Sequence, residues 1–235
     1  MPGRWVDSDE LNQNLADTTI SFRAMSITME EDISQPPTPD GTGLPANFHM
    51  VGPGIYRSSY PQAVHFDALK LYRFRTIITF VPEAIPPANT AFMHTHSIKH
   101  HHIHVLANKD AAVSTPAETV ISILKLIMDK RNHPVLIHCN KGKHRTGCIT
   151  ACFRKVTGWT DEACITEYEK YSQPKDRALD KEFIRAFNAT VGLKAVALHN
   201  GIVGGAFAQP CPESSKDSEC TAGTVTSDAS ASTAG

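Results

Sequence analysis

The ten residues HCNKGKHRTG, at positions 138–147, combine the side chains that phosphoryl transfer needs. Cys139 supplies a thiol, and Arg145 follows after five intervening residues. A thiol has an ordinary pKa of about 8.5, but a ring of backbone N–H groups at a helix N-terminus, beside an arginine, favours its thiolate. The planar fork of an arginine binds two phosphate oxygens, which a lysine cannot do. The spacing therefore predicts a nucleophile that accepts a phosphoryl group on sulfur.

The other residues of this segment complete the predicted anion cradle. Gly142 lets the turn close, and Gly147 permits tight packing where the next helix starts. The hydroxyl of Thr146 is placed to donate a hydrogen bond to the sulfur and ease its departure. A nucleotide-binding P-loop is excluded, because Gly142 and Lys143 are followed by His144 where that motif needs Ser or Thr.

Short β-branched runs and amphipathic stretches alternate along the chain and must position this loop. Such alternation indicates an α/β fold with a small, mostly parallel central sheet flanked by helices. In such a sheet ligands bind beyond the carboxyl ends of the strands, which is where the cysteine loop lies. The predicted strands are GIYRS at 54–58, TIITF at 76–80, IHVL at 103–106 and PVLIHC at 134–139.

The clearest predicted helix begins within TPAETVISILKLIMDK, residues 115–130. Thr115 and Glu118 have the spacing of a capping box, with Pro116 in the first turn. Later segments, CITACFRKV, EACITEYEKY and DKEFIRAF, also predict helices, so the C-terminal part of the domain is mainly helical. The apolar residues of the first helix recur at helical spacing and predict one buried stripe: Val120, Ile121, Leu124, Ile127 and Met128.

Composition limits the remaining possibilities. Hydrophobic residues make up 41% and charged residues 20% of the 235 positions, which is ordinary for a globular protein. A formal net charge of -1 gives no global field for nucleic acid, so any anion site must be local. No apolar run approaches a membrane span, and the first residues lack the apolar core of a signal peptide. We expect a cytoplasmic protein, with the nucleus as a second location.

The two ends of the chain differ in composition from its centre. Residues 1–43 are rich in Ser, Thr, Asp and Pro and predict a disordered arm. Residues 199–235 are small and polar, and such a composition buries too little apolar surface to order itself. The catalytic domain is therefore predicted at 44–198.

The histidines of HTHSIKHHHIH, residues 94–104, raise the alternative of a metal site. His100, His102 and His104 alternate along a strand pattern in which Ile103 and Val105 would face the core. A solvated strand flank accounts for this alternation better than a metal site does. No metal or other cofactor is predicted.

The loop resembles the HCxxxxxR[ST] signature of cysteine-dependent protein tyrosine phosphatases. More narrowly, it is similar to the plant and fungal atypical dual-specificity phosphatases, whose loop reads HC-x-x-GKHRTGC. The resemblance extends from about Leu44 to Phe187. It implies a tyrosine-phosphatase-like single domain that hydrolyses diphosphoinositol polyphosphates. The matching segments are NFHMVGPGIYRSSYP, TIITFVPEAIPPANTAF, HPVLIHC, CFRKVTGW and PKDRALDKEFI.

The resemblance also implies a role for each loop residue. Cys139 becomes the nucleophile, Arg145 the phosphate clamp, Thr146 the assisting hydroxyl and His138 the residue that orients the loop. Two lysines beside the reacting phosphate suit a substrate with several further phosphates. The residues that complete the cradle are Asn140, Lys141, Gly142, Lys143 and His144.

The general acid has no direct counterpart in this sequence. Tyrosine phosphatases take it from a WPD loop upstream of the cysteine, whereas the WTD of residues 159–161 follows the cysteine. Asp110 lies in the corresponding upstream loop, beside Lys109, which we count with the substrate-binding candidates. The family often reads KEP there, so this pair is a departure. Arg57, in YRSSYP, either lines the site or pins a strand end.

Three classes of function compete for these observations. The first is a metal-independent phosphatase whose partner is a small-molecule polyphosphate, an inositol pyrophosphate. The second keeps the chemistry and takes phosphoproteins as substrates. The third is a binding module or a rhodanese-like sulfur carrier; the intact Cys139, Arg145 and Thr146 argue against a pure binder, and a sulfur carrier does not require the Arg-Thr-Gly close.

Overall fold

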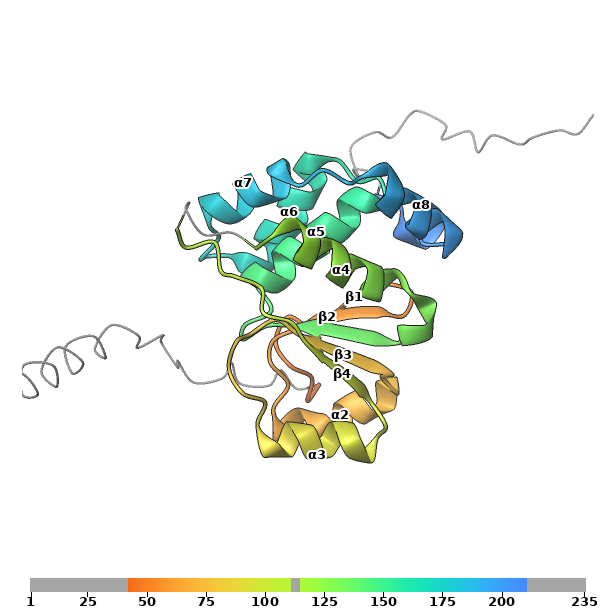
Figure 1. Cartoon of the computed structure of the whole chain (residues 1–235). Helices are drawn as coiled ribbons and strands as arrows, with labels where there is room; N and C mark the ends of the chain where they lie inside the picture. Colours follow the sequence, from red (N-terminus) through yellow and green to blue (C-terminus); the bar gives the residue numbers. More distant parts are fainter. Residues whose placement is uncertain (1–41, 111–114, 211–235) are drawn as a thin grey trace, which may run out of the picture.

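Five strands form one sheet in the order β1-β2-β5-β3-β4 (Figure 1). A computed structural model of the chain describes residues 42–110 and 115–210. Only β1 runs antiparallel, against β2, and the other pairs are parallel. The α/β fold with a mostly parallel sheet is therefore confirmed. The strands are β1 His49–Gly52, β2 Ile55–Ser58, β3 Thr76–Thr79, β4 Lys99–His102 and β5 Val135–His138.

Helices cover both faces of the sheet (Figure 1). On one face lie α2 Phe66–Leu69 and α3 Pro87–Thr95, and on the other α4 Ala117–Met128, α5 His144–Val156, α6 Asp161–Ser172, α7 Ala178–Ala186 and α8 Val191–His199. Short 3-10 helices span Ala63–His65, Lys70–Tyr72, Lys130–Asn132 and Gly205–Phe207. No helix in the described ranges is both long and apolar enough to cross a membrane.

The central strand β5 carries the cysteine loop at its carboxyl end. All four of its residues are buried, because β2 and β3 flank it and helices cover both faces. Its last residue, His138, pairs with Ser58 of β2 and Thr79 of β3, so the three strands end at the same level. The loop therefore leaves the middle of the sheet edge and enters α5 at His144.

The fourth predicted strand was placed too late in the sequence. The segment at 103–106 is not a strand; β4 is Lys99–His102, which pairs with β3 over its full length. The pairing stops because β3 itself ends at Thr79. Beyond it, the N–H groups of Ile103 and Val105 still donate to the carbonyls of Thr79 and Phe80, at 2.9 and 3.2 Å.

The helix α4 forms where it was predicted, but the predicted capping box is wrong. The helix begins at Ala117, and no side chain caps its N-terminus. The Thr115 hydroxyl instead accepts a hydrogen bond from the N–H of Leu106 at 2.9 Å, which ties the preceding loop to the helix start. Four residues of the predicted stripe are buried, whereas Ile121 is only partly buried and Ile123 takes its place in the core.

The folded part extends past residue 198, where the predicted domain ended. Ile202 and Phe207 are buried in the main apolar core, and the indole N–H of Trp159 donates to the carbonyl of Phe207 at 2.9 Å. The chain turns back after α8 through Gly201, whose φ of 62° a glycine adopts freely. Except for Thr42 and Gly43, the predicted N-terminal arm lies outside the described residues, as does the tail from 211 onward.

Candidate active site

Three donors hold successive carbonyl oxygens of the cysteine loop, residues 139–143, from its outer side. In a planar trans peptide the N–H points away from the C=O of the preceding residue. The N–H groups that follow these carbonyls therefore point toward the inside of the loop, as an anion cradle requires. The contacts are the Tyr60 N–H to the Asn140 carbonyl at 3.0 Å, Asn47 Nδ2 to Lys141 at 2.8 Å, and Arg57 Nη2 to Gly142 at 2.7 Å.

Both predicted glycine roles are confirmed by close approaches. Gly142 has a φ of 65°, and a Cβ there would lie 2.5 Å from the carbonyl oxygen of Ser58. A Cβ on Gly147 would lie 2.8 Å from the ring of Tyr168, so this glycine lets α5 and α6 pack closely. Any larger side chain at Gly142 would push the loop off the end of β2.

The loop and the first turn of α5 present a thiol, a hydroxyl and a guanidinium. Cys139 is 4% exposed and directly follows β5. Thr146 is fully buried, and its Oγ1 finds no hydrogen-bond partner among the described residues, so it is available to a group in the loop. The Arg145 side chain is partly exposed and forms no ion pair within the described part of the chain. The N-terminus of α5 adds about half a positive charge.

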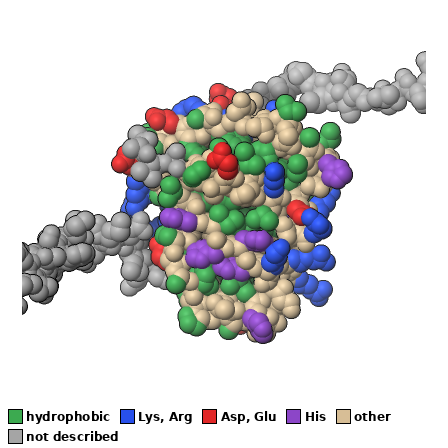
Figure 2. All heavy atoms as spheres, viewed as in Figure 1, with side chains coloured by type: hydrophobic (Ala, Val, Ile, Leu, Met, Phe, Trp, Pro, Cys, Tyr) green, Lys and Arg blue, Asp and Glu red, His purple; other side chains and the backbone are tan. Residues whose placement is uncertain are grey.

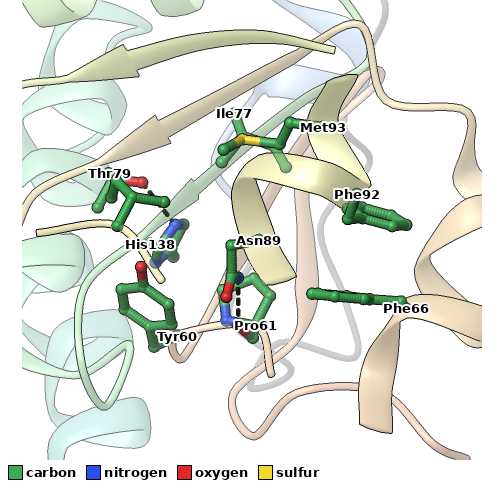
Figure 3. Close-up of a pocket in the computed structure, with 10 residues that line it drawn as sticks. Tyr60, Pro61, Phe66, Ile77, Thr79, Asn89, Phe92, Met93 and His138 are labelled. Carbon is green, nitrogen blue, oxygen red and sulfur yellow. Dashed lines mark hydrogen bonds between the residues drawn. The ribbon is translucent and has the colours of Figure 1, made fainter. Parts of the chain in front are cut away.

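His138, the last residue of β5, is buried and stays neutral. Burial lowers its pKa to about 3. Its Nε2 lies 2.8 Å from the Thr79 hydroxyl, which in turn lies 2.9 Å from Nε2 of His100, and its ring packs edge-on against Tyr60 (Figure 3). These contacts anchor the residue that precedes Cys139.

Figure 3 shows a small pocket on the α3 side of His138. Neither Cys139 nor Arg145 lines it, so it is separate from the anion cradle. Its walls are Tyr60, Pro61, Phe66, Ile77, Thr79, Ile85, Asn89, Phe92, Met93 and His138.

Arg57 lies behind the loop, and its burial does not fit the prediction that it contacts substrate. The side chain is 1% exposed, and its guanidinium stacks over the ring of Tyr171 at 3.9 Å. Besides the bond to Gly142, its Nε and Nη1 have no hydrogen-bond partner among the described residues. Burial lowers its pKa from the ordinary arginine value, and nearby Cys139 opposes that shift. The structural role predicted for Arg57 is the closer of the two, although its bond holds the cysteine loop at Gly142 and not a strand end.

The remaining predicted residues are exposed or partly exposed. Asn140 and Lys141 are exposed, and Nζ of Lys143 donates to the carbonyl of Gln173, between α6 and α7, at 3.0 Å. Lys109 and Asp110 are exposed and directly precede residues 111–114, which lie outside the described part. Their loop is nevertheless anchored, because the preceding residue, Asn108, is buried.

A buried carboxylate beside the loop was missed. Asp180, in the first turn of α7, is 1% exposed. Its Oδ2 accepts from Nδ1 of His144 at 3.0 Å and from the Tyr168 hydroxyl at 2.6 Å, and its Oδ1 accepts from Nδ2 of Asn108 at 2.9 Å. The available signal was its position: Asp180 and Ile184 are the two buried residues of α7, one helical turn apart, so an acid occupies the apolar face.

The predicted outward-facing flank holds for His102 and His104, which are exposed, but not for His100. His100 is partly buried against Thr79, and Nε2 of His102 lies 2.5 Å from the carbonyl of Val81. Figure 2 shows histidine side chains gathered on the face viewed. Among the described residues, no three His, Cys, Asp or Glu side chains are grouped so that they could hold a metal ion.

The cysteine loop joins a central parallel strand to a helix, and its N–H groups point inward. It has a thiol at its start and an arginine just after its end. This combination defines a cysteine-dependent phosphatase. The chain belongs to the tyrosine phosphatase family, whose model matches residues 44–200. It is therefore a hydrolase of phosphate groups, as its sequence predicted.

Similar proteins of known name agree with this class. The chain is 42% identical over 144 residues to inositol diphosphatase DSP3 of Arabidopsis thaliana, which covers 61% of this chain and 71% of that protein. It is 38% identical to inositol diphosphatase SIW14 of Saccharomyces cerevisiae, over 61% of this chain and 52% of that protein. The crystal structure of the core catalytic domain of that yeast phosphatase, in complex with citrate, matches with a TM-score of 0.61 at 34% identity, over 67% of this chain and 94% of that one.

Proposed function

We propose that this phosphatase hydrolyses inositol diphosphates, the diphosphoinositol polyphosphates, through a phosphocysteine intermediate. The observation that carries the proposal is the cationic rim of an otherwise ordinary phosphate cradle: Lys141 and Lys143 stand within the cysteine loop, and His144 follows them at the start of α5. A single phosphate is already served by the loop N–H groups and Arg145. Further cations suit a substrate that carries further phosphates. The similarity to proteins named inositol diphosphatase supports the same substrate class.

In the proposed reaction the Cys139 thiolate attacks the terminal phosphorus in line. An S–P bond forms while the bond to the bridging oxygen breaks, and the inositol phosphate leaves. The loop N–H groups and Arg145 stabilise the equatorial oxygens during the transfer. Water then attacks the phosphorus of the phosphocysteine, the S–P bond breaks, and the proton of the water leaves with the inorganic phosphate. The departing thiolate accepts a hydrogen bond from the Thr146 hydroxyl. The buried hydroxyl of Thr146, which has no hydrogen-bond partner in the described ranges, supports this assignment.

A comparison of specificity constants tests the substrate class. Given a diphosphoinositol polyphosphate and a phosphotyrosine peptide separately, we expect the higher kcat/KM for the inositol compound. Lys141→Ala and Lys143→Ala should each lower that kcat/KM about five-fold, the effect of losing roughly 1 kcal/mol. Their effect on the peptide should be smaller. Phosphate release in a stopped assay measures all of these rates.

Salt and a distant lysine provide the controls for this comparison. The loss in both rim variants should shrink as ionic strength rises, because rim contacts are screened over about 10 Å at 0.1 M. Lys70→Ala removes an exposed lysine that pairs with Asp67 and lies far from the loop in sequence. This variant should leave kcat/KM unchanged for both substrates. A preference for the peptide that is insensitive to the rim variants would instead make the enzyme a protein phosphatase.

We further propose Asp110 as the general acid, on the grounds of its place in the loop between β4 and α4. Asp110→Asn should slow an alkyl phosphomonoester about 100-fold, because a poor leaving oxygen needs a proton. A diphosphate should be slowed less than about five-fold, because its phosphate leaving group needs that proton less. Initial rates with the two substrates check this. Equal losses, or none, would remove Asp110 from the role.

A further inference from the structure

Asp180 joins three segments that surround the cysteine loop. His144 is the first residue of α5, Tyr168 lies in α6, and Asn108 lies in the loop that leads from β4 to α4. All three donate to the one carboxylate, at 3.0, 2.6 and 2.9 Å. Tyr168 also accepts from the N–H of Arg177 at 3.2 Å, which adds the α6–α7 connection to the network.

The carboxylate is ionised and fixes the protons of its partners. Burial raises its pKa, but the hydrogen bonds from His144, Tyr168 and Asn108 outweigh burial, and the pKa is lowered on balance. An ionised carboxylate only accepts, so Nδ1 of His144 and the oxygen of Tyr168 each carry the shared proton. Burial and Asp180 together raise the pKa of Tyr168, which keeps this hydroxyl protonated.

This network has a mechanical consequence. His144 belongs to the phosphate cradle, and Asn108 belongs to the loop from which a tyrosine phosphatase-like enzyme protonates its leaving group. These two residues are 36 positions apart, and Asp180, a further 36 positions along the chain, bonds to both. Asp180 is only 1% exposed, so water cannot replace either of these two hydrogen-bond partners of the carboxylate.

We propose that Asp180 is a positioning residue: it holds the loop between β4 and α4 in register with the cysteine loop, so that the leaving oxygen is protonated as the S–P bond forms. This inference rests on the proposed phosphoryl transfer, although not on the choice of an inositol substrate. Asp180 acts on catalysis through other groups, because its carboxylate is buried and bonds to His144, Tyr168 and Asn108.

The negative charge of the Asp180 carboxylate and its positioning role have opposite effects on the reaction rate. A negative charge near the cradle opposes both the thiolate and the binding of phosphate. By its field alone, Asp180→Asn would therefore strengthen phosphate binding and speed the reaction. By loss of position, the same change would slow the reaction, because an amide offers one acceptor oxygen to three donors.

The dependence of the rate on the leaving group separates positioning from general damage. Phenyl phosphate has a poor leaving group and depends on the proton, whereas 4-nitrophenyl phosphate depends on it much less. We expect Asp180→Asn to lower kcat about thirty-fold with phenyl phosphate and less than about five-fold with 4-nitrophenyl phosphate, within the cost of a misplaced catalytic group. The inhibition constant of inorganic phosphate should stay within about three-fold.

A second variant breaks the link and keeps the charge. Asn108→Ala should show the same leaving-group pattern, with about a ten-fold loss for phenyl phosphate. In the double variant the loss should be no greater than in Asp180→Asn alone, because both changes cut one connection. Asp161→Asn, which removes a carboxylate 2.9 Å from Lys155 at the other end of α5, is the matched control and should leave both rates within about two-fold.

Three results would overturn the inference. These are equal losses with the two esters, additive losses in the double variant, and faster turnover of phenyl phosphate by Asp180→Asn. Thermal unfolding of each variant is measured alongside, and the rates are compared well below the lowest Tm. Both esters are simple aryl phosphates, so a failure here is distinct from a failure of the inositol assignment, which wild-type specificity constants test.

Discussion

The Cys139→Ser protein is expected to bind substrate and to turn it over at least about 10⁴ times more slowly than the wild type. Serine fits the space of the thiol, and the cradle consists of backbone N–H groups that the substitution leaves in place. A hydroxyl, however, does not ionise near neutral pH and is a poor nucleophile there. Single-turnover phosphate release measures the rate, and calorimetric titration with the substrate measures the binding.

Another buried cysteine supplies the control for this experiment. Cys164 lies in α6, and burial raises its pKa to about 12, so it remains an inert thiol. Cys164→Ser should therefore keep wild-type turnover. Wild-type turnover in Cys139→Ser would show that the sulfur is not the attacking atom, and loss of binding as well as turnover would show that the substitution damages the cradle.

Replacing Arg145 by lysine should lower kcat about 10³-fold, although the charge is kept. A lysine offers a single ammonium group on a flexible stem, whereas the arginine fork meets two equatorial oxygens of the transferring phosphoryl group at once. The loss should fall mainly on kcat, because the fork fits the transition state better than the ground state. Steady-state kinetics with 4-nitrophenyl phosphate measure both constants.

The same substitution away from the loop calibrates this result. Arg131 is exposed and pairs with Asp129, with Nη2 2.7 Å from Oδ2. Arg131→Lys should leave kcat and KM unchanged. If Arg145→Lys changed only KM, the arginine would serve to bind the ground state, and its proposed role in the transfer would be wrong.

The anion cradle was predictable because its parts are neighbours in sequence. One loop and one helical turn contain all four key residues: Cys139, Gly142, Arg145 and Thr146. The preceding apolar run predicts the buried strand. The donors that turn its carbonyls outward were not predictable in the same way. Asn47 contacts a residue 94 positions away, and Arg57 one that is 85 positions away. Only the folded sheet edge brings these segments together.

The errors have the same origin in long-range contacts. The position of β4 is set by its pairing with β3 and not by the β-branched residues of its own segment. Polar histidines therefore form the strand, and the run IHVL lies beyond its end. Thr115 has the spacing of a helix cap, but its hydroxyl is used by Leu106. The segment from 199 to 210 is held in place because Phe207 packs into the core against Gly52. A Cβ on Gly52 would lie 2.5 Å from the Phe207 ring.

Arg57 also bears on how stability and activity relate in this fold. A guanidinium that is 1% exposed, with two nitrogens lacking partners among the described residues, costs folding free energy that an apolar side chain of similar size would not. The same guanidinium turns the Gly142 carbonyl outward and so shapes the cradle. Selection of variants for heat resistance alone would favour losing this charge, and with it the loop geometry. Thermostable forms of this enzyme are therefore best sought in positions that leave Arg57 untouched.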